Sequence, residues 1–322
     1  MRNFNLKDFT LNWMGRGDQF RSKSRGTFWP SEARAEFTNA NGHQEVLGKC
    51  MRASYYRLTG APLTNPPSAK SQVIFHLGNQ IEDGIVEIWK QAGIWDNNSV
   101  RFEDRDKNIS GEFDCVLRDP TVELIGLPKF GAEVKTFYGY MQEKTILGHS
   151  EGRGARKHWV WGKPKDENLM QAAIYCDQTR DTLSGFKLYY ISRDKNDMAE
   201  FNISVDDNGT IFIHDPKRGG APLPETRFAM NDIYDSWTDL KGFIERGEIP
   251  ARDFDFRPSQ EKIEEMYGLG EISKSAYEKH NSGKIPYRDW HCSYCSYRDH
   301  CQGPEAAAER IVDPEETEED VA

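Results

Sequence analysis

The segment G-E-F-D-C-V-L-R-D (Gly111–Asp119) and the later segment F-G-A-E-V-K-T-F (Phe130–Phe137) decide the fold of this chain. Both alternate apolar and polar residues with a period of two, which predicts two half-buried strands. Residues two apart on a strand point to the same face, so Glu133 and Lys135 share one surface while their neighbours pack behind it. If the strands pair, Asp114 reaches that surface too. We therefore expect two carboxylates and one ammonium on one sheet face.

Two carboxylates on one face repel each other unless a cation holds them together. Mg²⁺ suits this arrangement because it prefers oxygen ligands and accepts one or two carboxylates plus a phosphate. At a phosphodiester, the ammonium of Lys135 would orient the attacking water and offset the charge that develops on the phosphate. A surface hairpin with a Glu–Lys ion pair has the same short pattern, so the other motifs have to decide between the two interpretations.

The composition is that of a folded globular protein. The 322 residues include 37% hydrophobic and 12% aromatic residues, which is enough for a real core. We expect no membrane span, because no run of about 18 apolar residues occurs, and the N-terminus has no apolar signal-peptide segment. These features predict a cytoplasmic protein whose six cysteines are thiols or metal ligands rather than disulfides.

The net charge of −10 is concentrated near the C-terminus. Residues 305–322 contain eight acids and one arginine, which account for seven of the ten net negative charges. We expect residues 304–322 to be an acidic, disordered tail, residues 1–45 an N-terminal arm and residues 46–303 one domain. The nearly neutral remainder can still bind nucleic acid through a local basic groove.

Two segments mix basic and aromatic residues. Residues 1–45 have an irregular, polar pattern and either track a nucleic-acid strand or pack on the domain. Residues 144–165 are expected to be a long loop that grips phosphates and stacks bases. A plain surface loop would have a similar content of lysine and arginine. The candidate DNA-binding residues in this loop are Arg153, Arg156, Lys157, Trp159 and Trp161.

Apolar periodicity predicts the other elements. A helix over residues 69–92 carries His76 in its first turns. A helix over residues 167–180 places Gln171 and Tyr175 on one face, because they are four residues apart. The remaining predicted elements are helices over residues 51–58, 232–247 and 259–280, and strands over residues 186–192, 200–205 and 210–214.

Three cysteines near the C-terminus are spaced C-x2-C-x5-C. A zinc site would complete this set with His291 or His300. An iron–sulfur cluster requires four thiolates, and Cys50 would then be the fourth. Cys115 and Cys176 lie inside apolar patterns and are expected in the core. The three closely spaced cysteines are Cys292, Cys295 and Cys301.

Five motifs occur in order: His76, the G-x-x-D of Gly111–Asp114, the E-V-K of Glu133–Lys135, the Q-x3-Y of Gln171–Tyr175 and the split cysteine set. Together they resemble the RecB-type branch of the PD-(D/E)xK nucleases, and the cysteines resemble its iron–sulfur members, such as Cas4 and the AddB nuclease domain. The resemblance covers residues 46–303. It implies an α/β, restriction-endonuclease-like core, in which helices flank a central mixed sheet and a [4Fe–4S] cluster closes a helical region.

The resemblance also implies roles for single residues. Lys135 would act on the nucleophilic water, and Gln171 and Tyr175 would steady the site and the scissile phosphate. The ligands of Mg²⁺ or Mn²⁺ would be His76, Asp114, Glu133 and the Val134 carbonyl. The ligands of the cluster would be Cys50, Cys292, Cys295 and Cys301.

The function implied by the resemblance is metal-dependent hydrolysis of DNA. The chain would be an exonuclease acting on single-stranded or processed ends in recombination or repair, virus-encoded versions included, with a recombination or single-strand-annealing protein as partner. It has no helicase motif such as G-x4-G-K-[ST], so we expect a stand-alone nuclease. Two other classes stay open: a zinc-stabilised structure-specific endonuclease, and a nucleic-acid-binding module without catalysis, which would not need the Asp114, Glu133 and Lys135 set.

Overall fold

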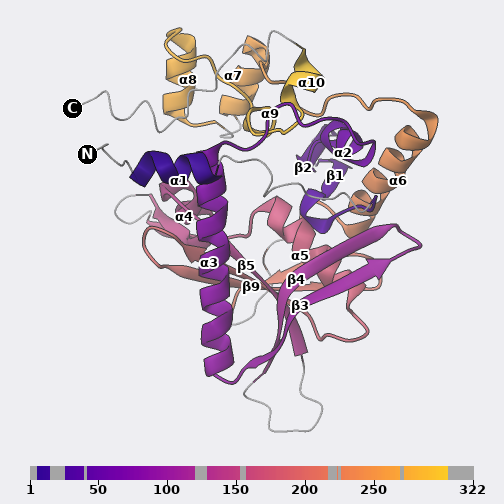
Figure 1. Ribbon diagram of the computed structural model, residues 1–322. Coiled ribbons are helices and arrows are strands. Elements are labelled where there is room, and N and C mark those ends of the chain that lie inside the picture. The colour runs from indigo at the N-terminus through magenta and orange to yellow at the C-terminus, as the bar shows by residue number, and fades with distance from the viewer. Residues whose placement is uncertain are drawn as a thin grey trace. The chain divides into compact units, whose positions relative to one another are not determined.

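Figure 1 shows the computed structural model of the chain. It describes residues 6–14, 26–39, 42–119, 129–152, 157–216, 223, 226–268 and 272–303. The chain divides into two compact units. The first consists of Met1–Lys49 and Ala69–Gly242, and the second of Cys50–Ser68 and Phe243–Ala322. The predicted domain of residues 46–303 therefore spans both units, and the predicted tail of residues 304–322 lies outside the described residues.

The first unit is built on a six-stranded mixed sheet with the order β10-β9-β8-β5-β4-β3. The segments around Asp114 and Glu133 form β4 and β5, which pair antiparallel as predicted. β5 and β8 are parallel, whereas every other pair in this sheet is antiparallel. The strands are β3 (Trp95–Asp104), β4 (Ile109–Arg118), β5 (Lys129–Phe137), β8 (Phe186–Ser192), β9 (Met198–Val205) and β10 (Ile211–His214).

Helices cover both faces of this sheet, which confirms the predicted α/β class (Figure 1). On one face, Ile85 of α3 (Ala69–Gln91) packs against Val134 of β5. Val86, also on α3, contacts Cys115 and Ala132. Ala132 and Val134 thus lie behind the Glu133 surface, as predicted. On the other face lies α5 (Asp166–Gln178), which buries Leu169–Cys176.

Two parts of the first unit are more regular than predicted. The irregular pattern predicted for residues 1–45 is wrong, because α1 (Leu6–Met14), the short helix η2 (Pro30–Glu32) and the strand β1 (Arg34–Thr38) lie there; β1 pairs with β2 (Gln44–Gly48). The loop predicted for residues 144–165 is also wrong in part. It contains the end of α4 (Tyr140–Leu147) and a ribbon of β6 (Gly148–Glu151) and β7 (His158–Trp161).

The second unit is mainly helical. Its N-terminal segment begins with α2 (Met51–Leu58), and the Met51 amide donates to Asp253 at 2.7 Å. The predicted helix of residues 259–280 is instead two helices. Ile263 and Met266 on the first helix share a buried cluster with Ile272, which lies between the two. The helices of the C-terminal segment are α7 (Gln260–Gly268), α8 (Lys274–Asn281), α9 (Trp290–Ser293) and α10 (Arg298–Gln302), and α6 (Met230–Arg246) ends in this unit. No helix in the described part of the chain is both long enough and apolar enough to span a membrane.

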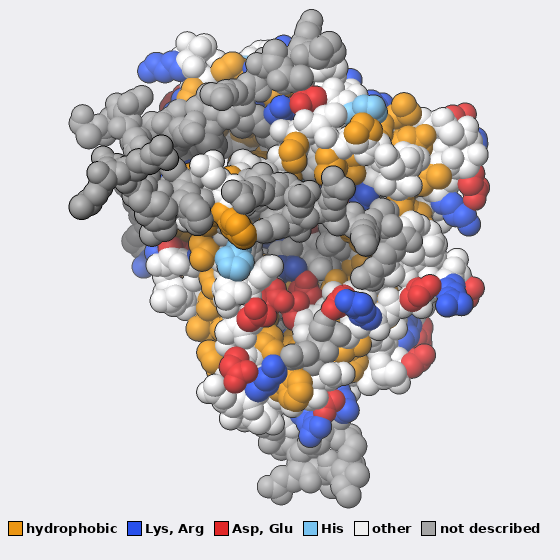
Figure 2. Space-filling model, viewed as in Figure 1, with side chains coloured by type: hydrophobic (Ala, Val, Ile, Leu, Met, Phe, Trp, Pro, Cys, Tyr) orange, Lys and Arg blue, Asp and Glu red, His pale blue; other side chains and the backbone are white. Residues whose placement is uncertain are grey.

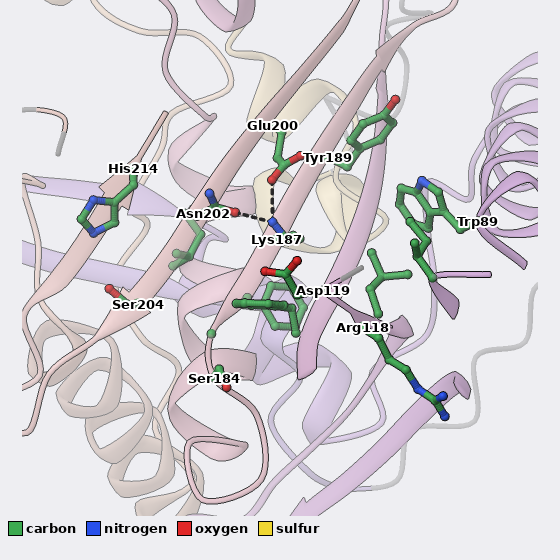
Figure 3. A pocket seen from close by; sticks show the side chains of 16 residues that line it. Trp89, Arg118, Asp119, Ser184, Lys187, Tyr189, Glu200, Asn202, Ser204 and His214 are labelled. Carbon is green, nitrogen blue, oxygen red and sulfur yellow. Dashed lines mark hydrogen bonds and ion pairs between the residues drawn. The ribbon is translucent and has the colours of Figure 1, made fainter. Parts of the chain in front are cut away.

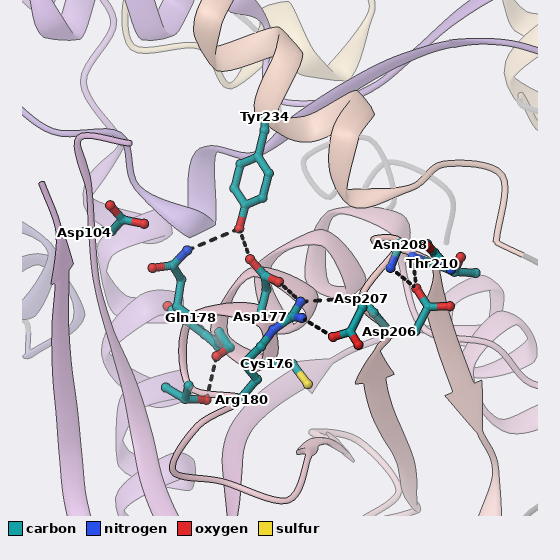
Figure 4. Close-up of polar contacts among 12 residues, drawn as sticks. Asp104, Cys176, Asp177, Gln178, Arg180, Asp206, Asp207, Asn208, Thr210 and Tyr234 are labelled. Atoms are coloured by element: carbon teal, nitrogen blue, oxygen red, sulfur yellow. Dashed lines mark hydrogen bonds and ion pairs between the residues drawn. The ribbon is translucent and has the colours of Figure 1, made fainter. Parts of the chain in front are cut away.

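Polar contacts tie the C-terminal end of α5 to its surroundings in the first unit (Figure 4). Asp177 accepts hydrogen bonds from the Tyr234 hydroxyl and from the Arg180 guanidinium. Gln178 donates to the same hydroxyl at 3.3 Å, and Arg180 donates to Asp207, after β9, at 3.1 Å. These bonds fix the end of the helix that carries Gln171 and Tyr175.

Replacing Tyr234 with Phe should lower the free energy of unfolding by about 1.5–3 kcal/mol, because a partly buried carboxylate loses a hydrogen bond. Urea denaturation followed by circular dichroism measures the change. Tyr140→Phe is the control, since Tyr140 is 69% exposed and should contribute nothing. Equal stability of the Tyr234→Phe and Tyr140→Phe proteins would contradict the role given to this network.

Candidate active site

The site begins where the pairing of β4 and β5 stops. The last paired residues are Cys115 and Ala132. One step further, Oδ2 of Asp114 accepts a hydrogen bond from the Val134 amide at 2.6 Å, in place of a backbone carbonyl. The strands therefore separate with a carboxylate between them, which sets Asp114 beside Glu133 as predicted.

Glu133 is the centre of the site. It is 4% exposed, and its Oε1 accepts hydrogen bonds from Lys135 Nζ at 2.6 Å and from Gln171 Nε2 at 2.8 Å. Its Oε2 is buried and has no hydrogen-bond partner among the described residues. A buried carboxylate oxygen without a donor is costly, so this atom is where an added positive charge would stabilise the site most.

α5 holds Glu133 in place through the hydrogen bond from Gln171. Gln171 also donates to the Tyr175 hydroxyl at 2.9 Å, and that hydroxyl donates to the Glu112 carbonyl at 2.9 Å. The Tyr175 ring lies against Phe113 and Phe186. Gln171 and Tyr175 thus share one helix face, as predicted, and orient the Glu133 carboxylate.

The sequence analysis missed one acid, Glu82 on α3. Its side chain is hydrogen-bonded to Asp114, and it interacts electrostatically with Glu133 and Lys135. The available signal was its spacing, because Glu82 lies four residues before Val86, which packs on the sheet, and residues four apart share a helix face.

His76, the ligand expected from the same helix, is exposed. Among the described residues it makes no hydrogen bond with Asp114 or Glu133. It precedes Glu82 by six residues, which is about 9 Å along a helix axis. The structure thus places Glu82, rather than His76, in contact with the other acids.

The pKa values of the carboxyl groups are shifted upward because these groups are buried close to one another. Burial raises the pKa of Asp114, and Glu82 raises it further. Burial raises the pKa of Glu133 to about 7, although Lys135 opposes the rise. For Lys135, burial lowers the pKa, but Glu133 and the other acids outweigh burial and raise it. Lys135 therefore stays charged. The carboxyl groups of Asp114 and Glu133 bind protons more tightly than usual, and an added cation would compete with those protons.

The lining of an open pocket of about 630 Å³ includes the acids Glu82, Glu112 and Asp114. Acidic side chains also gather near the middle of the face in Figure 2. Within the described ranges, no group of three or more His, Cys, Asp or Glu side chains has the arrangement of a metal site. The carboxylates are close together but not arranged as a finished coordination sphere.

A second pocket, of about 660 Å³, lies on the α3 face of the sheet (Figure 3). Lys187 on β8 donates there to Glu200 at 2.7 Å and to Asn202 at 2.8 Å, both on β9. Its ammonium also lies 5.0 Å from the centre of the Phe130 ring. Lys187 is therefore held by partners on its own sheet, and neither Glu133 nor Lys135 lines this pocket.

The cysteines predicted to bind a cluster all belong to the second unit. Cys50 caps the start of α2, and Cys292 and Cys301 lie on α9 and α10. Burial raises the pKa of the Cys292 thiol, and after Asp289 the other three thiols raise it further, so the four lie within electrostatic range. Gln302 Nε2 lies 4.0 Å from both the Cys292 and the Cys301 sulfur.

The residues around these thiols bear on the zinc alternative. His291 stacks on Phe254, with ring centres 3.7 Å apart, and its Nδ1 is 3.0 Å from Asp289. His300 contacts the edge of the Tyr56 ring. Both histidines already have partners within the fold. Cys115 and Cys176 are buried in the first unit, which confirms their predicted core positions.

Three of the five predicted DNA-binding residues lie on or beside the β6–β7 ribbon. Lys157 directly precedes β7, and Trp159 and Trp161 are part of it. Arg153 and Arg156 lie outside the described residues.

Comparison with known proteins gives little further information. No protein-family model and no curated protein matches the sequence. One solved structure, titled "Crystal structure of SSO0001", aligns over 93% of this chain and 98% of its own, with 13% identity and a TM-score of 0.40. So weak a similarity does not bear on the function of this chain.

The buried carboxyl predicts a pH-dependent stability. The pKa of Glu133 is about 7 in the folded chain and about 4.3 in an unfolded chain. The folded chain therefore binds this proton more tightly, so the stability it contributes is complete below about pH 4.3 and is lost as the pH rises through about 7. In EDTA, the melting temperature of the wild-type protein should fall relative to that of Glu133→Gln between about pH 5 and pH 8.

Scanning calorimetry of both proteins in matched buffers measures this difference. Mn²⁺ added at the higher pH should restore the wild-type melting temperature and leave that of Glu133→Gln unchanged, because the cation replaces the proton. A difference that does not vary with pH would show that Glu133 titrates normally.

Proposed function

We propose that this chain is a Mg²⁺- or Mn²⁺-dependent deoxyribonuclease of the RecB-type PD-(D/E)xK class. The observation that supports this most is the buried Oε2 of Glu133, which has no hydrogen-bond partner among the described residues and lies beside a second carboxylate and an ammonium. A surface ion pair, the plainer interpretation of the motif, has neither burial nor an adjacent acid.

The donor set fits a hard divalent cation. Asp114, Glu133 and Glu82 offer carboxylate oxygens, and the raised pKa values of these acids express the same unbalanced negative charge that a dication would neutralise. The resemblance also implies the Val134 carbonyl and His76 as ligands, but His76 is exposed and Glu82 is the residue of α3 that contacts the other acids. Bound Mg²⁺ or Mn²⁺ would supply Lewis acidity at the phosphate and acidify its water.

The protein's own groups would do the rest. Lys135, held at 2.6 Å from Glu133 and 27% exposed, presents its ammonium to a water or to a phosphate oxygen. Asp114 is oriented by the Val134 amide. Gln171 holds Glu133 and is held in turn by Tyr175, so the acceptor geometry is set before substrate arrives.

Substrate and pathway are part of the same proposal. Asp114 and Glu82 line an open pocket through which a strand would approach the site. We infer an exonuclease that acts on single-stranded or processed DNA ends, in cytoplasmic recombination or repair, alongside a recombination or single-strand-annealing protein. The cysteines in the described part of the chain form no disulfide, which is consistent with a reducing compartment.

The second unit would hold a [4Fe–4S] cluster on Cys50, Cys292, Cys295 and Cys301. Four thiols from the two separate segments of the unit gather there, and His291 is stacked and hydrogen-bonded elsewhere, which disfavours a Cys3His zinc site. Such a cluster would join the N-terminal and C-terminal segments of this unit.

Lys135→Ala should lower the turnover of end-labelled single-stranded DNA with Mg²⁺ by several orders of magnitude, because the ammonium acts in the transition state. Lys187→Ala is the matched control: this lysine also pairs with a glutamate at sheet level but lies in the other pocket. Its turnover should match that of the wild type. Full activity of Lys135→Ala would exclude the assigned site.

Cys50→Ala should lose iron as completely as Cys295→Ala, although these residues lie in different segments of the chain. Cys176→Ala, a buried thiol of the first unit, should keep it. After anaerobic purification, metal analysis should find about four irons per chain. One zinc per chain would instead support the local zinc site and the structure-specific endonuclease, and full iron retention in Cys50→Ala would contradict the role of Cys50 as a ligand.

A further inference from the structure

The ribbon formed by β6 and β7 carries two tryptophans on one face. Its register pairs Gly148 with Trp161 and Ser150 with Trp159. Since cross-strand partners point to the same side, the indole face has only a glycine and a serine opposite the two rings. Trp159 is 51% exposed and Trp161 is 44% exposed. Small partners thus leave much of two large aromatic surfaces accessible to solvent.

The ribbon is anchored firmly at its base. Gly148 has φ +80°, and a Cβ there would lie 2.5 Å from the Val160 carbonyl oxygen. A Cβ on Gly162 would lie 2.0 Å from the Ile146 carbonyl oxygen. The two glycines therefore allow the ribbon to start directly at the end of α4, where Lys163 also donates to Thr145 at 2.9 Å. The exposed indoles are therefore carried by a paired strand whose base packs against the end of α4.

The ribbon is inserted between the two elements that build the acid site. β5, with Glu133 and Lys135, precedes it, and α5, with Gln171, follows it. α4 is the only element between β5 and the ribbon, and its eight residues span about 12 Å. The ribbon is thus connected through one short helix to the strand that carries Glu133 and Lys135.

The basic residues near the two tryptophans indicate what kind of ligand this face would bind. Residues 144–165 contain six lysines and arginines and one glutamate, in a chain of net charge −10. Lys157 and Lys163 are exposed on either side of β7. Flat aromatic faces beside cations suit nucleobases attached to phosphates. Bases in a duplex are already stacked, so only unpaired bases can use such faces.

We propose that the β6–β7 ribbon is a stacking site for unpaired bases of a single-stranded nucleic acid. The proposal rests on the proposed nuclease function for its biological purpose, and it specifies the substrate as a strand with at least one unpaired base beside the scissile phosphate. Trp159 and Trp161 bind bases, and the exposed lysines bind phosphates.

The test is a binding titration in EDTA, which prevents cleavage, with a labelled oligothymidylate of about 15 nucleotides and a duplex of equal length. The full-length wild-type protein is compared with Trp159→Ala, Trp161→Ala and Trp159→Phe. Phe212→Ala is the control, because Phe212 is an exposed aromatic residue on β10, away from the ribbon. Anisotropy gives affinity, and quenching of tryptophan fluorescence reports contact with the bases.

Either alanine variant should weaken single-strand binding roughly 5- to 150-fold, the equivalent of about 1–3 kcal/mol per stacked base. The salt dependence should not change, because no phosphate contact is lost. Trp159→Phe should retain most of the affinity, and duplex binding and the Phe212→Ala control should be unaffected. Equal losses for single strand and duplex, or no loss in either alanine variant, would overturn the proposal.

The outcomes separate this proposal from the nuclease proposal. Ribbon-dependent binding in a protein that cleaves nothing with Mg²⁺ or Mn²⁺ supports the stacking site and refutes the nuclease. Cleavage by a protein whose single-strand affinity ignores both tryptophans supports the nuclease and refutes the stacking site. If the alanine variants instead change the oligomeric state in sedimentation, with unchanged DNA affinity, the indole face binds a second copy and the proposal fails.

Discussion

The hydrogen bond from the Val134 amide to the Asp114 carboxylate is the contact on which the arrangement of the acids depends. A backbone donor next to a sheet pair normally bonds a backbone acceptor, and here a side chain takes that place. The exchange stops the β4–β5 ladder at Cys115 and Ala132. It also fixes a carboxylate next to Glu133, in a position that burial makes unfavourable. The Val134 amide thus holds the Asp114 carboxylate in a buried position that is unfavourable for the charged group on its own.

Contacts from several elements offset the unfavourable burial of these carboxylates. Lys135 offsets part of the charge at Glu133, and Gln171 satisfies one lone pair of the same carboxylate. Tyr175 transmits the constraint to β4 through the Glu112 carbonyl. None of these contacts compensates Oε2 of Glu133. The network therefore leaves one acceptor of Glu133 open, and it is at this atom that the proposed cation would add the missing positive charge.

The sequence predicted the elements around this site well, because their signals are local. The alternation in β4 and β5 and the four-residue spacing of Gln171 and Tyr175 depend only on the period of the backbone. Glu82 was missed because an acid on a long amphipathic helix looks like a solvated residue until the sheet is placed against it. The ribbon was mistaken for a loop because its strands are four residues each, too short for periodicity to be read.

The second unit is assembled from two segments that are far apart in the chain, Cys50–Ser68 and Phe243–Ala322. During synthesis the first of these segments emerges early, but the residues it bonds, such as Asp253 and Ser296, come much later. At ribosomal speeds the interval is roughly 10–40 s. The first unit can complete its sheet in that time, whereas α2 has to wait without its partners. The order of folding is therefore dictated by translation, and the cysteine-bearing unit is completed last.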